Sequence, residues 1–441
     1  MSAYADILIQ NLYLYSFRNY LDIYIVELLF SKCDLKIEEN FIDEEDETAE
    51  PYTRYSYQTT VKRAKERLDA MGYSVISSEK YLVANVFEVL DYAPFLYHLG
   101  VSFDELEDES KDRIEKYFTF KKWKNALDRI IKHELKHGNI TSFSKDHDFC
   151  PKTEYDKLIY YALKDEGAES YYAIDIEVMD LAYIFRQILE CCNNDDSIIL
   201  DFTNLVSWDE DNIPSAIDCT EKCIVLVEGS SDKNILEFAL GMIYPHLADL
   251  FYFMDFSDQN GNTRPGGTPE IKKQMEVFYY SKLQAKFIAV FDNDAIGFKD
   301  KTLLLYEKIK NWPENFRILC YPQNSFFNKY PTLAPSGQLL FDNINRKACS
   351  IELYLPDRLI KQDGGYFPIE WESRQKIKYA DEGTEYLYQG VISNKEKIKK
   401  DFHKLKNDIE SGKESFDISE WKRMKELLDA IVFAFKYDQN I

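Results

Sequence analysis

Short apolar segments separated by helical patterns constrain the fold of this chain more than any other feature. The apolar segments are SIILDF (197–202), CIVLVE (223–228), ADLFYFMDFS (248–257), KFIAVF (286–291) and FRILCY (316–321). Helical patterns lie between them at 232–245 and 299–311, and a further helix is expected to be capped by Thr268 and to start at Pro269. Strands that alternate with helices of about 10–15 residues are typical of βαβ units and a parallel sheet. The sequence therefore predicts an α/β domain over residues 196–360.

Several of the predicted strands end on carboxylates. Glu228 ends the second apolar segment, Asp255 ends the third, and Asp292 and Asp294 follow the fourth. In open parallel sheets, ligands bind outside the carboxyl ends of the strands. Like charges that lie close together are costly unless a cation compensates them, and sites built from oxygen atoms suit Mg²⁺ or Mn²⁺. We therefore expect a divalent-cation site at this edge of the sheet.

The rest of the chain is predicted to be mainly helical. The N-terminal part contains one alternating, strand-like segment (4–16) and an acidic segment (36–50) that is typical of a solvated loop. Helical patterns follow at 58–72, with Thr59 or Thr60 as N-cap and Gly72 as C-cap, and at 80–137, 154–165, 175–192, 393–412 and 418–437. The sequence thus predicts three domains, over residues 1–195, 196–360 and 361–441, of which the last is a C-terminal helical extension.

Composition excludes some classes of protein. The net charge of −23 over 441 residues argues against a protein that coats nucleic acid without specificity, although it is compatible with a nuclease. The sequence has no apolar run of about 18 residues and no N-terminal secretory signal, so we expect a cytoplasmic protein with no membrane association. Its eight cysteines include no C-x-x-C pair, which favours buried free thiols over a zinc site.

The strand-end carboxylates resemble a known motif. A hydrophobic strand that ends in Glu228-Gly229, followed by one that ends in Asp292-Asn293-Asp294, resembles the Toprim domain of topoisomerases, bacterial primases and nucleases of the overcoming-lysogenisation-defect class. The resemblance covers roughly 220–360 and implies a Rossmann-like parallel sheet. It is closest to the nuclease branch, in which a further acid commonly follows four residues after the Glu and another lies on a later segment. The residues that match these two acids are Asp232 and Glu352.

The N-terminal segments YADILIQNLYLYSFRNYLD (4–22) and TTVKRAKERLDAMGY (59–73) resemble the amino-terminal domain of bacterial HEPN/Toprim-associated proteins. Such proteins are thought to act in anti-phage defence, and the whole chain is similar to that group. Active HEPN ribonucleases carry an Arg and a His at a characteristic spacing. Arg129 does not have this spacing to His133 or to His137, so we do not expect a second, metal-free ribonuclease site.

A basic segment at 111–137 offers a second candidate site. Its cations alternate with aromatic residues, a combination that binds single-stranded nucleic acid, although a solvated helix face would have a similar pattern. The candidate nucleic-acid contacts are Lys121, Lys122, Trp123, Lys124 and Arg129. The same segment contains the H-E-x-x-H pattern of zinc proteases at 133–137. Its helix is lysine-rich rather than apolar, and its candidate third ligand is His147, so the protease interpretation is disfavoured.

The sequence therefore predicts a metal-dependent endonuclease of anti-phage defence that hydrolyses RNA, such as transfer RNA, or DNA. Glu228, Asp292 and Asp294 would bind one or two Mg²⁺ or Mn²⁺ ions, with Asp232, Asp255 and Glu352 as further ligands, and Lys299 would stabilise phosphate charge. The loop at 259–268 matches no P-loop, so no nucleotide binding by this chain is expected.

Two alternatives to this interpretation differ in class. One is a catalytically quiet subunit that binds an ATPase or another partner through the helical region. The other, a primase or topoisomerase, lacks a zinc ribbon and a recognisable context for a strand-passage tyrosine. A toxic nuclease needs restraint, so a regulatory protein partner or a homo-oligomeric gate is also expected.

Overall fold

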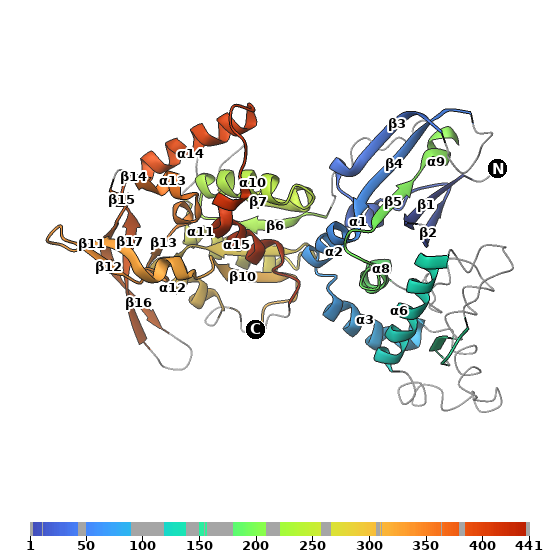
Figure 1. The fold of residues 1–441 in the computed structure, drawn as a ribbon. Coiled ribbons are helices and arrows are strands. Elements are labelled where there is room, and N and C mark those ends of the chain that lie inside the picture. The colour runs from blue at the N-terminus through green and yellow to red at the C-terminus, as the bar shows by residue number, and fades with distance from the viewer. Residues whose placement is uncertain are drawn as a thin grey trace, which may run out of the picture. The chain divides into compact units, whose positions relative to one another are not determined.

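The structure is a computed structural model (Figure 1) that forms two compact units, Met1–Thr220 and Glu221–Ile441, which are described separately. It describes residues 3–10, 12–42, 50–89, 119–137, 150–153, 155–156, 180–208, 221–256, 266–305, 309, 311–362, 364–378 and 384–437. The predicted helices at 154–165 and 175–192 and the loop at 259–268 therefore lie partly outside the described residues, as does the middle of 80–137. In the described part, no helix is both long enough and apolar enough to cross a membrane.

The N-terminal unit contains an antiparallel sheet with the strand order β2-β1-β5-β4-β3. Its strands are β1 (Tyr4–Ile9), β2 (Leu12–Arg18), β3 (Leu35–Phe41), β4 (Tyr52–Thr60) and β5 (Ser197–Asp201). In β1, Ala5, Ile7 and Ile9 are fully buried and alternate with more exposed neighbours, as expected for a sheet with one covered face. The described part of the N-terminal domain therefore combines helices with a sheet that the prediction lacked, and the first half of the acidic segment 36–50 is a strand rather than a loop.

The helices of this unit are α1 (Ile23–Leu29), α2 (Val61–Ala70), α3 (Val75–Val89), α6 (Phe120–His137), α8 (Leu181–Leu189) and α9 (Thr203–Trp208). The predicted N-cap of α2 is confirmed, whereas its C-cap is Met71 and Gly72 is the residue after it. Thr60 Oγ1 accepts a hydrogen bond from the Arg63 backbone N–H at 3.3 Å, and Gly72 has a φ of 87°, which favours glycine after a helix.

The pairing of strand β5 shows that the domain boundary lies later in the chain than predicted. It pairs with both β1 and β4, so the residues 197–201 complete the N-terminal sheet. The boundary predicted at 195/196 is therefore too early, because a short apolar strand carries no information in its own sequence about which sheet it joins.

The C-terminal unit contains the predicted parallel sheet, with the strand order β10-β8-β6-β7. Its strands are β6 (Cys223–Leu226), β7 (Phe251–Met254), β8 (Phe287–Phe291) and β10 (Phe316–Cys320). The helices α10 (Ser230–Ile243), α11 (Thr268–Tyr280) and α12 (Ala295–Leu303) follow β6, β7 and β8 respectively. Strand β8 lies between two neighbours and is buried along its whole length, which explains its unbroken apolar sequence.

Two details of these helices differ from the prediction. Gly267, not Thr268, is the N-cap of α11, and the Thr268 hydroxyl instead donates to the Asp300 carboxylate. Helix α12 begins at Ala295, earlier than the predicted 299, because the Asp294 side chain caps it.

The segment after 322 contains a second sheet, with the strand order β12-β11-β16-β17, which was not predicted. Its strands are β11 (Tyr330–Leu333), β12 (Leu339–Asp342), β16 (Ile369–Lys378) and β17 (Thr384–Ile392). Shorter elements are η5 (Ala248–Leu250), η7 (Ser325–Lys329), β9 (Asn293–Asp294), β13 (Ala348–Cys349), η8 (Ile351–Tyr354), α13 (Asp357–Ile360), β14 (Lys361–Gln362), β15 (Gly365–Tyr366) and η9 (Ile418–Trp421). Residues 361–441 are therefore not a purely helical extension.

The two predicted C-terminal helices are present, as α14 (Lys395–Glu410) and α15 (Lys422–Val432). Both lie close to α10 in Figure 1. The ring of Phe238 on α10 lies 5.8 Å from those of Phe402 on α14 and Trp421 at the start of α15. These aromatic contacts join the C-terminal helices to the α/β domain, so they are part of the same unit.

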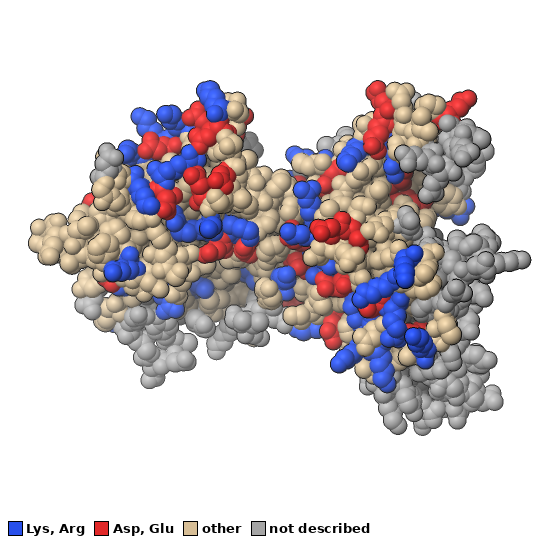
Figure 2. All heavy atoms as spheres, in the orientation of Figure 1, with Lys and Arg blue, Asp and Glu red and all other residues tan. Residues whose placement is uncertain are grey.

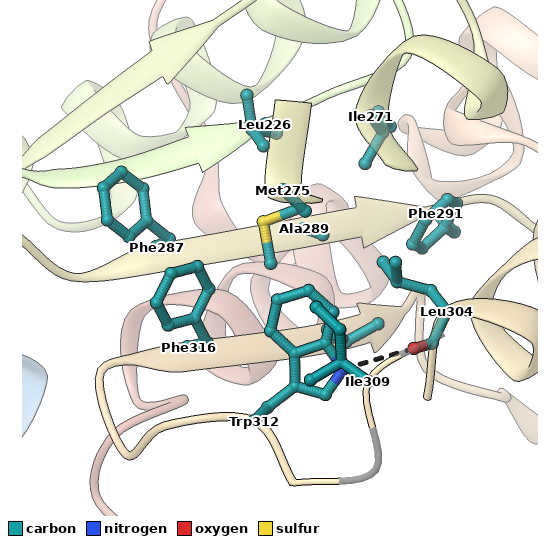
Figure 3. Packing of buried hydrophobic residues seen from close by; sticks show 11 residues of the cluster. Leu226, Ile271, Met275, Phe287, Ala289, Phe291, Leu304, Ile309, Trp312 and Phe316 are labelled. Carbon is teal, nitrogen blue, oxygen red and sulfur yellow. Dashed lines mark hydrogen bonds between the residues drawn. The ribbon is translucent and has the colours of Figure 1, made fainter. Parts of the chain in front are cut away.

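An aromatic cluster fills the space between the parallel sheet and helix α11 (Figure 3). Phe287 is fully buried there, with its ring 4.4 Å from that of Phe278 and 5.0 Å from that of Phe316. Trp312 closes the cluster and donates a hydrogen bond to the Leu304 carbonyl at 3.2 Å.

Phe287→Ala is expected to lower the free energy of unfolding by about 3–5 kcal/mol, because it removes buried ring contacts and leaves a cavity. Chemical denaturation of the purified protein would measure the change. Tyr280→Ala is the matched control, since Tyr280 is 70% exposed, and its effect should stay within about 0.5 kcal/mol. Similar losses for both variants would contradict the assignment of this core.

Candidate functional site

Glu228 and Asp292 meet at the carboxyl end of the parallel sheet. Each follows one of the neighbouring strands β6 and β8. The Asp292 backbone N–H donates a hydrogen bond to Glu228 Oε1 at 3.2 Å, which ties the two strand ends together. The backbone is also tightly packed here, because a Cβ at Gly297 would lie 2.4 Å from the Asp292 carbonyl oxygen. Only glycine fits at that position without a shift of the backbone.

Asp294 is fixed from two sides. Its Oδ1 accepts from the Gly297 backbone N–H at 2.7 Å, which caps α12, and its Oδ2 accepts from Gln389 Nε2 at 2.7 Å. The intervening Asn293 is buried and accepts the Arg346 backbone N–H at 2.9 Å. Asp294 is thus held in one orientation, while Asp292 Oδ1 is buried without a hydrogen-bond partner.

Strand pairing brings Glu352 to the same site. Strand β9, which contains Asp294, pairs with β13, and β13 leads directly into the short helix η8 that carries Glu352. Glu352 is fully buried, and its Oε2 accepts from Ser350 Oγ at 2.6 Å. Lys395 Nζ, at the start of α14, lies 3.3 Å from the same oxygen, whereas Oε1 has no hydrogen-bond partner.

Burial and mutual repulsion change the acidity of these groups. Burial, and then the charge of Asp294, raises the pKa of Glu228 to about 8. Burial, and then the charge of Glu352, raises the pKa of Asp232, in the first turn of α10, to about 7. The pKa of Asp292 is raised well above its usual value by burial and by Glu228. These acids therefore lie close enough to one another to resist full ionisation in the absence of a cation.

Lys395 supplies a positive charge that the sequence analysis did not place at this site. Burial opposes its charged form, but Glu352, Asp292 and Asp232 together raise its pKa above the usual value. The pKa values of the cluster acids are raised overall, and the charge of Lys395 offsets part of this rise for Glu228, Asp232, Asp292 and Asp294. The only signal in the sequence was the position of Lys395 at the start of a lysine-rich helix.

Tyr321, which follows β10, is a second residue that the sequence analysis missed. Its side chain is buried, and its pKa is raised well above the usual value by burial and by the charges of Asp232, Asp292 and Glu228. The carboxylate cluster thus consists of Glu228, Asp232, Asp292, Asp294 and Glu352, with Lys395 and Tyr321 beside it.

Two further residues that were predicted to act at the site, Asp255 and Lys299, have no contact with the carboxylate cluster among those described above. Asp255 follows β7 and lies 3.7 Å from Lys233 Nζ, on α10. Lys299 is partly exposed on α12. Their roles at the site stay predictions.

The predicted nucleic-acid surface on α6 is smaller than expected. Lys121 and Lys122 are exposed, but Trp123 is only 1% exposed and its ring is part of the core. Lys124 turns inward and donates to the Gln187 carbonyl, and Arg129 Nε donates to Asp156 Oδ1 at 3.0 Å. The prediction that Trp123 stacks on bases is therefore wrong, because α6 buries this ring to form its apolar face.

The H-E-x-x-H segment of α6 does not present its glutamate as the general base of a zinc protease would be presented. The rings of His133 and His137 stack at 4.7 Å, and Glu134 is fully buried. The third candidate ligand, His147, lies outside the described residues.

No three His, Cys, Asp or Glu side chains in the described ranges form a ready-made metal-binding group. Mg²⁺ does not require one, since it is usually bound through one or two carboxylates, with water and substrate phosphates as further ligands. The unpartnered oxygens Asp292 Oδ1 and Glu352 Oε1 are hard, anionic ligands that suit such an ion. The carboxylate cluster therefore fits a divalent cation in its chemistry.

Comparison with protein families identifies the class of the chain. Residues 1–218 match the family described as HEPN/Toprim N-terminal domain 1. The chain is therefore a HEPN/Toprim-associated domain protein, as its N-terminal segments predicted. No curated protein and no solved structure matches it.

Proposed function

We propose that the C-terminal unit is a Toprim domain that hydrolyses phosphodiester bonds in RNA or DNA with Mg²⁺ or Mn²⁺. The observation that carries this proposal is the meeting of Glu228 and Asp292 at the ends of adjacent parallel strands, with Asp292 Oδ1 buried and unpartnered. The family name of the N-terminal domain supports it, because that domain is named for its association with Toprim.

The residues of the cluster have different roles in this proposal. Glu228, Asp292 and Glu352 would hold the cation, which would neutralise phosphate charge and lower the pKa of an attacking water. Asp294, held by Gln389 and the start of α12, keeps the strand end in place. Lys395 would stabilise negative charge on the phosphate, since it lies among the carboxylates.

The cellular role follows from the family resemblance. We propose that the protein is an effector of bacterial anti-phage defence in the cytoplasm, restrained by a protein partner or by a homo-oligomeric gate. The alternative is a subunit without catalytic activity that binds an ATPase or another partner.

A cleavage assay on the purified chain tests the proposal. Total transfer RNA, single-stranded DNA and plasmid would each be incubated with Mg²⁺, Mn²⁺ or EDTA. We expect at least one substrate to be cut with a divalent cation and none to be cut in EDTA. Cutting that persists in EDTA would contradict the cation-dependent mechanism. If nothing is cut even when partners captured from cells are added, the alternative of an interaction subunit would be favoured.

A further inference from the structure

Helix α14 carries a row of lysines that starts at the carboxylate cluster. The helix buries Ile398, Phe402, Leu405 and Ile409 against the rest of the unit. Successive residues of a helix are about 100° apart, which places Lys395, Lys399 and Lys406 together on one flank of this buried face. From the first to the last, the row extends for about 16 Å along the helix axis at about 1.5 Å per residue.

Contacts of Lys395 and Lys406 show where this lysine row lies. Lys395 Nζ is 3.3 Å from Glu352 Oε2, inside the cluster. Lys399 follows Lys395 by about one helical turn and so lies on the same side of α14. Lys406 Nζ lies 5.9 Å from the centre of the Phe238 ring on α10. The lysine row therefore leads from the carboxylates along the side of α14 that faces α10.

Lys399 and Lys406, the two lysines of the row that are farther from the carboxylates, are available to a ligand. Lys399 pairs with Glu396 at 3.5 Å and Lys406 pairs with Glu410 at 3.7 Å, and both acids are exposed. Exposed ion pairs of this kind contribute only about 0–1 kcal/mol. Exchange of either glutamate for a phosphate would therefore cost little. Figure 2 shows Lys and Arg side chains gathered over α14, with acidic side chains among them.

We propose that Lys399 and Lys406 bind phosphates on one side of the scissile phosphate, so that the site takes a nucleic-acid strand and not a free nucleotide. The proposal rests on the proposed nuclease function. A chain with a net charge of −23 repels a polyanion as a whole, so local cations must hold the strand. One strand rises about 3.4 Å per nucleotide in a duplex, so the lysine row is long enough to follow several phosphates.

Helix α14 also offers a matched control. Lys400 and Lys404 are exposed lysines of the same helix, but they lie on the side away from the carboxylates and from α10. A Lys400→Gln/Lys404→Gln variant changes the net charge as much as Lys399→Gln/Lys406→Gln does. Any difference between the two variants therefore reports the position of the charges and not their number.

The test measures binding separately from cleavage. Both double variants would be made in the Asp292→Asn background, and circular dichroism would confirm that they fold. Fluorescence anisotropy would give the affinity for labelled single-stranded DNA and RNA over a series of salt concentrations. We expect Lys399→Gln/Lys406→Gln to weaken binding about 10-fold and to reduce the slope of log K against log salt by about 1.4, at about 0.7 per lost phosphate contact. The control pair should leave the slope unchanged.

Equal effects of the two double variants, or no effect of either, would contradict the proposal that the lysine row binds phosphates. Either result would leave the nuclease proposal intact. Competition by a mononucleotide as strong as that by the strand would also contradict the proposal for the lysine row. Stronger binding of the RNA or of the DNA strand by the parent protein would identify the sugar that the site prefers. Failure of the nuclease function itself would be seen separately, as absence of cleavage by the unmutated chain.

Discussion

Replacement of Asp292 by asparagine is expected to end phosphodiester cleavage and, in EDTA, to make the protein more stable. Asn has nearly the same shape but no charge, so it replaces an anionic ligand, whose Oδ1 is buried without a partner, by a neutral amide. Loss of a group that stabilises charge in a transition state typically costs about 10²–10³-fold in rate. The same change removes an acid whose own pKa is raised well above its usual value by burial and by the charge of Glu228. The mutation thus separates catalysis from stability.

The stability effect has a defined pH dependence in the metal-free protein. The folded-state pKa values of Glu228, at about 8, and of Asp232, at about 7, lie above their unfolded values. Between the unfolded-state and the folded-state pKa of each acid, the folded protein binds more protons than the unfolded chain does. Stability therefore falls as pH rises from about 4 to about 8. The pKa of Asp292 is also raised well above its usual value, so Asp292→Asn, which is neutral at every pH, removes the contribution of this group and should make the fall smaller. Each kcal/mol regained would raise the unfolding midpoint by about 2–4 °C.

Thermal unfolding in EDTA at pH 6 and pH 9 would measure this effect, with Glu370→Gln as the control for an exposed acid on β16. Addition of Mg²⁺ at pH 9 should stabilise the unmutated protein and have less effect on Asp292→Asn. A variant that is less stable than the parent at pH 9 would contradict the interpretation of Asp292 as a strained charge.

The parallel sheet and its carboxylates could be predicted because local sequence determines both. Strand β8 is buried on both faces and therefore reads as an unbroken apolar run, and the chain must place its next residues, Asp292 and Asp294, at the sheet edge. Glu228 follows the neighbouring strand β6 for the same reason. Glu352 was predicted as a site residue from the family resemblance alone. The structure connects it to Asp294 through the pairing of β9 with β13.

The rest depends on contacts between distant segments, which local patterns do not encode. Strand β5 joins β1 and β4 across a long stretch of chain, so the antiparallel sheet of the N-terminal unit was not predicted beside its helices. Lys395 enters the cluster from a C-terminal helix that is far from the carboxylates in sequence. Trp123 appeared to be a stacking residue because its burial depends on what α6 packs against.

Lys395→Met is expected to reduce both cleavage and stability. Its ammonium group lies among Glu352, Asp292 and Asp232, which together raise its pKa despite burial. Removal of one partner from a partly buried charge cluster should cost about 1–3 kcal/mol, less than for a fully buried pair because the lysine side chain is 35% exposed. Loss of a cation beside the reacting phosphate should slow cleavage about 100-fold.

Cleavage kinetics and thermal unfolding would measure the two effects, with Lys400→Met as the control on an exposed position of the same helix. Lys395→Arg keeps the charge but not the shape, so it should restore more of the stability than of the activity. Since Lys395→Met lowers the unfolding midpoint in EDTA while Asp292→Asn raises it, the double variant should fall between them. The difference from additivity would then report the coupling between the two side chains.

The same comparison distinguishes Lys395 from Lys299, the cation that the sequence alone favoured. Lys299 follows the Asp pair on α12 and is partly exposed, whereas Lys395 makes a contact with Glu352 that ties α14 to the carboxylates. Lys299→Met should therefore leave stability unchanged and reduce cleavage less than Lys395→Met does. If the order were reversed, the phosphate would be stabilised from the side of α12, and the charge of Lys395 would serve only to hold the folded cluster together.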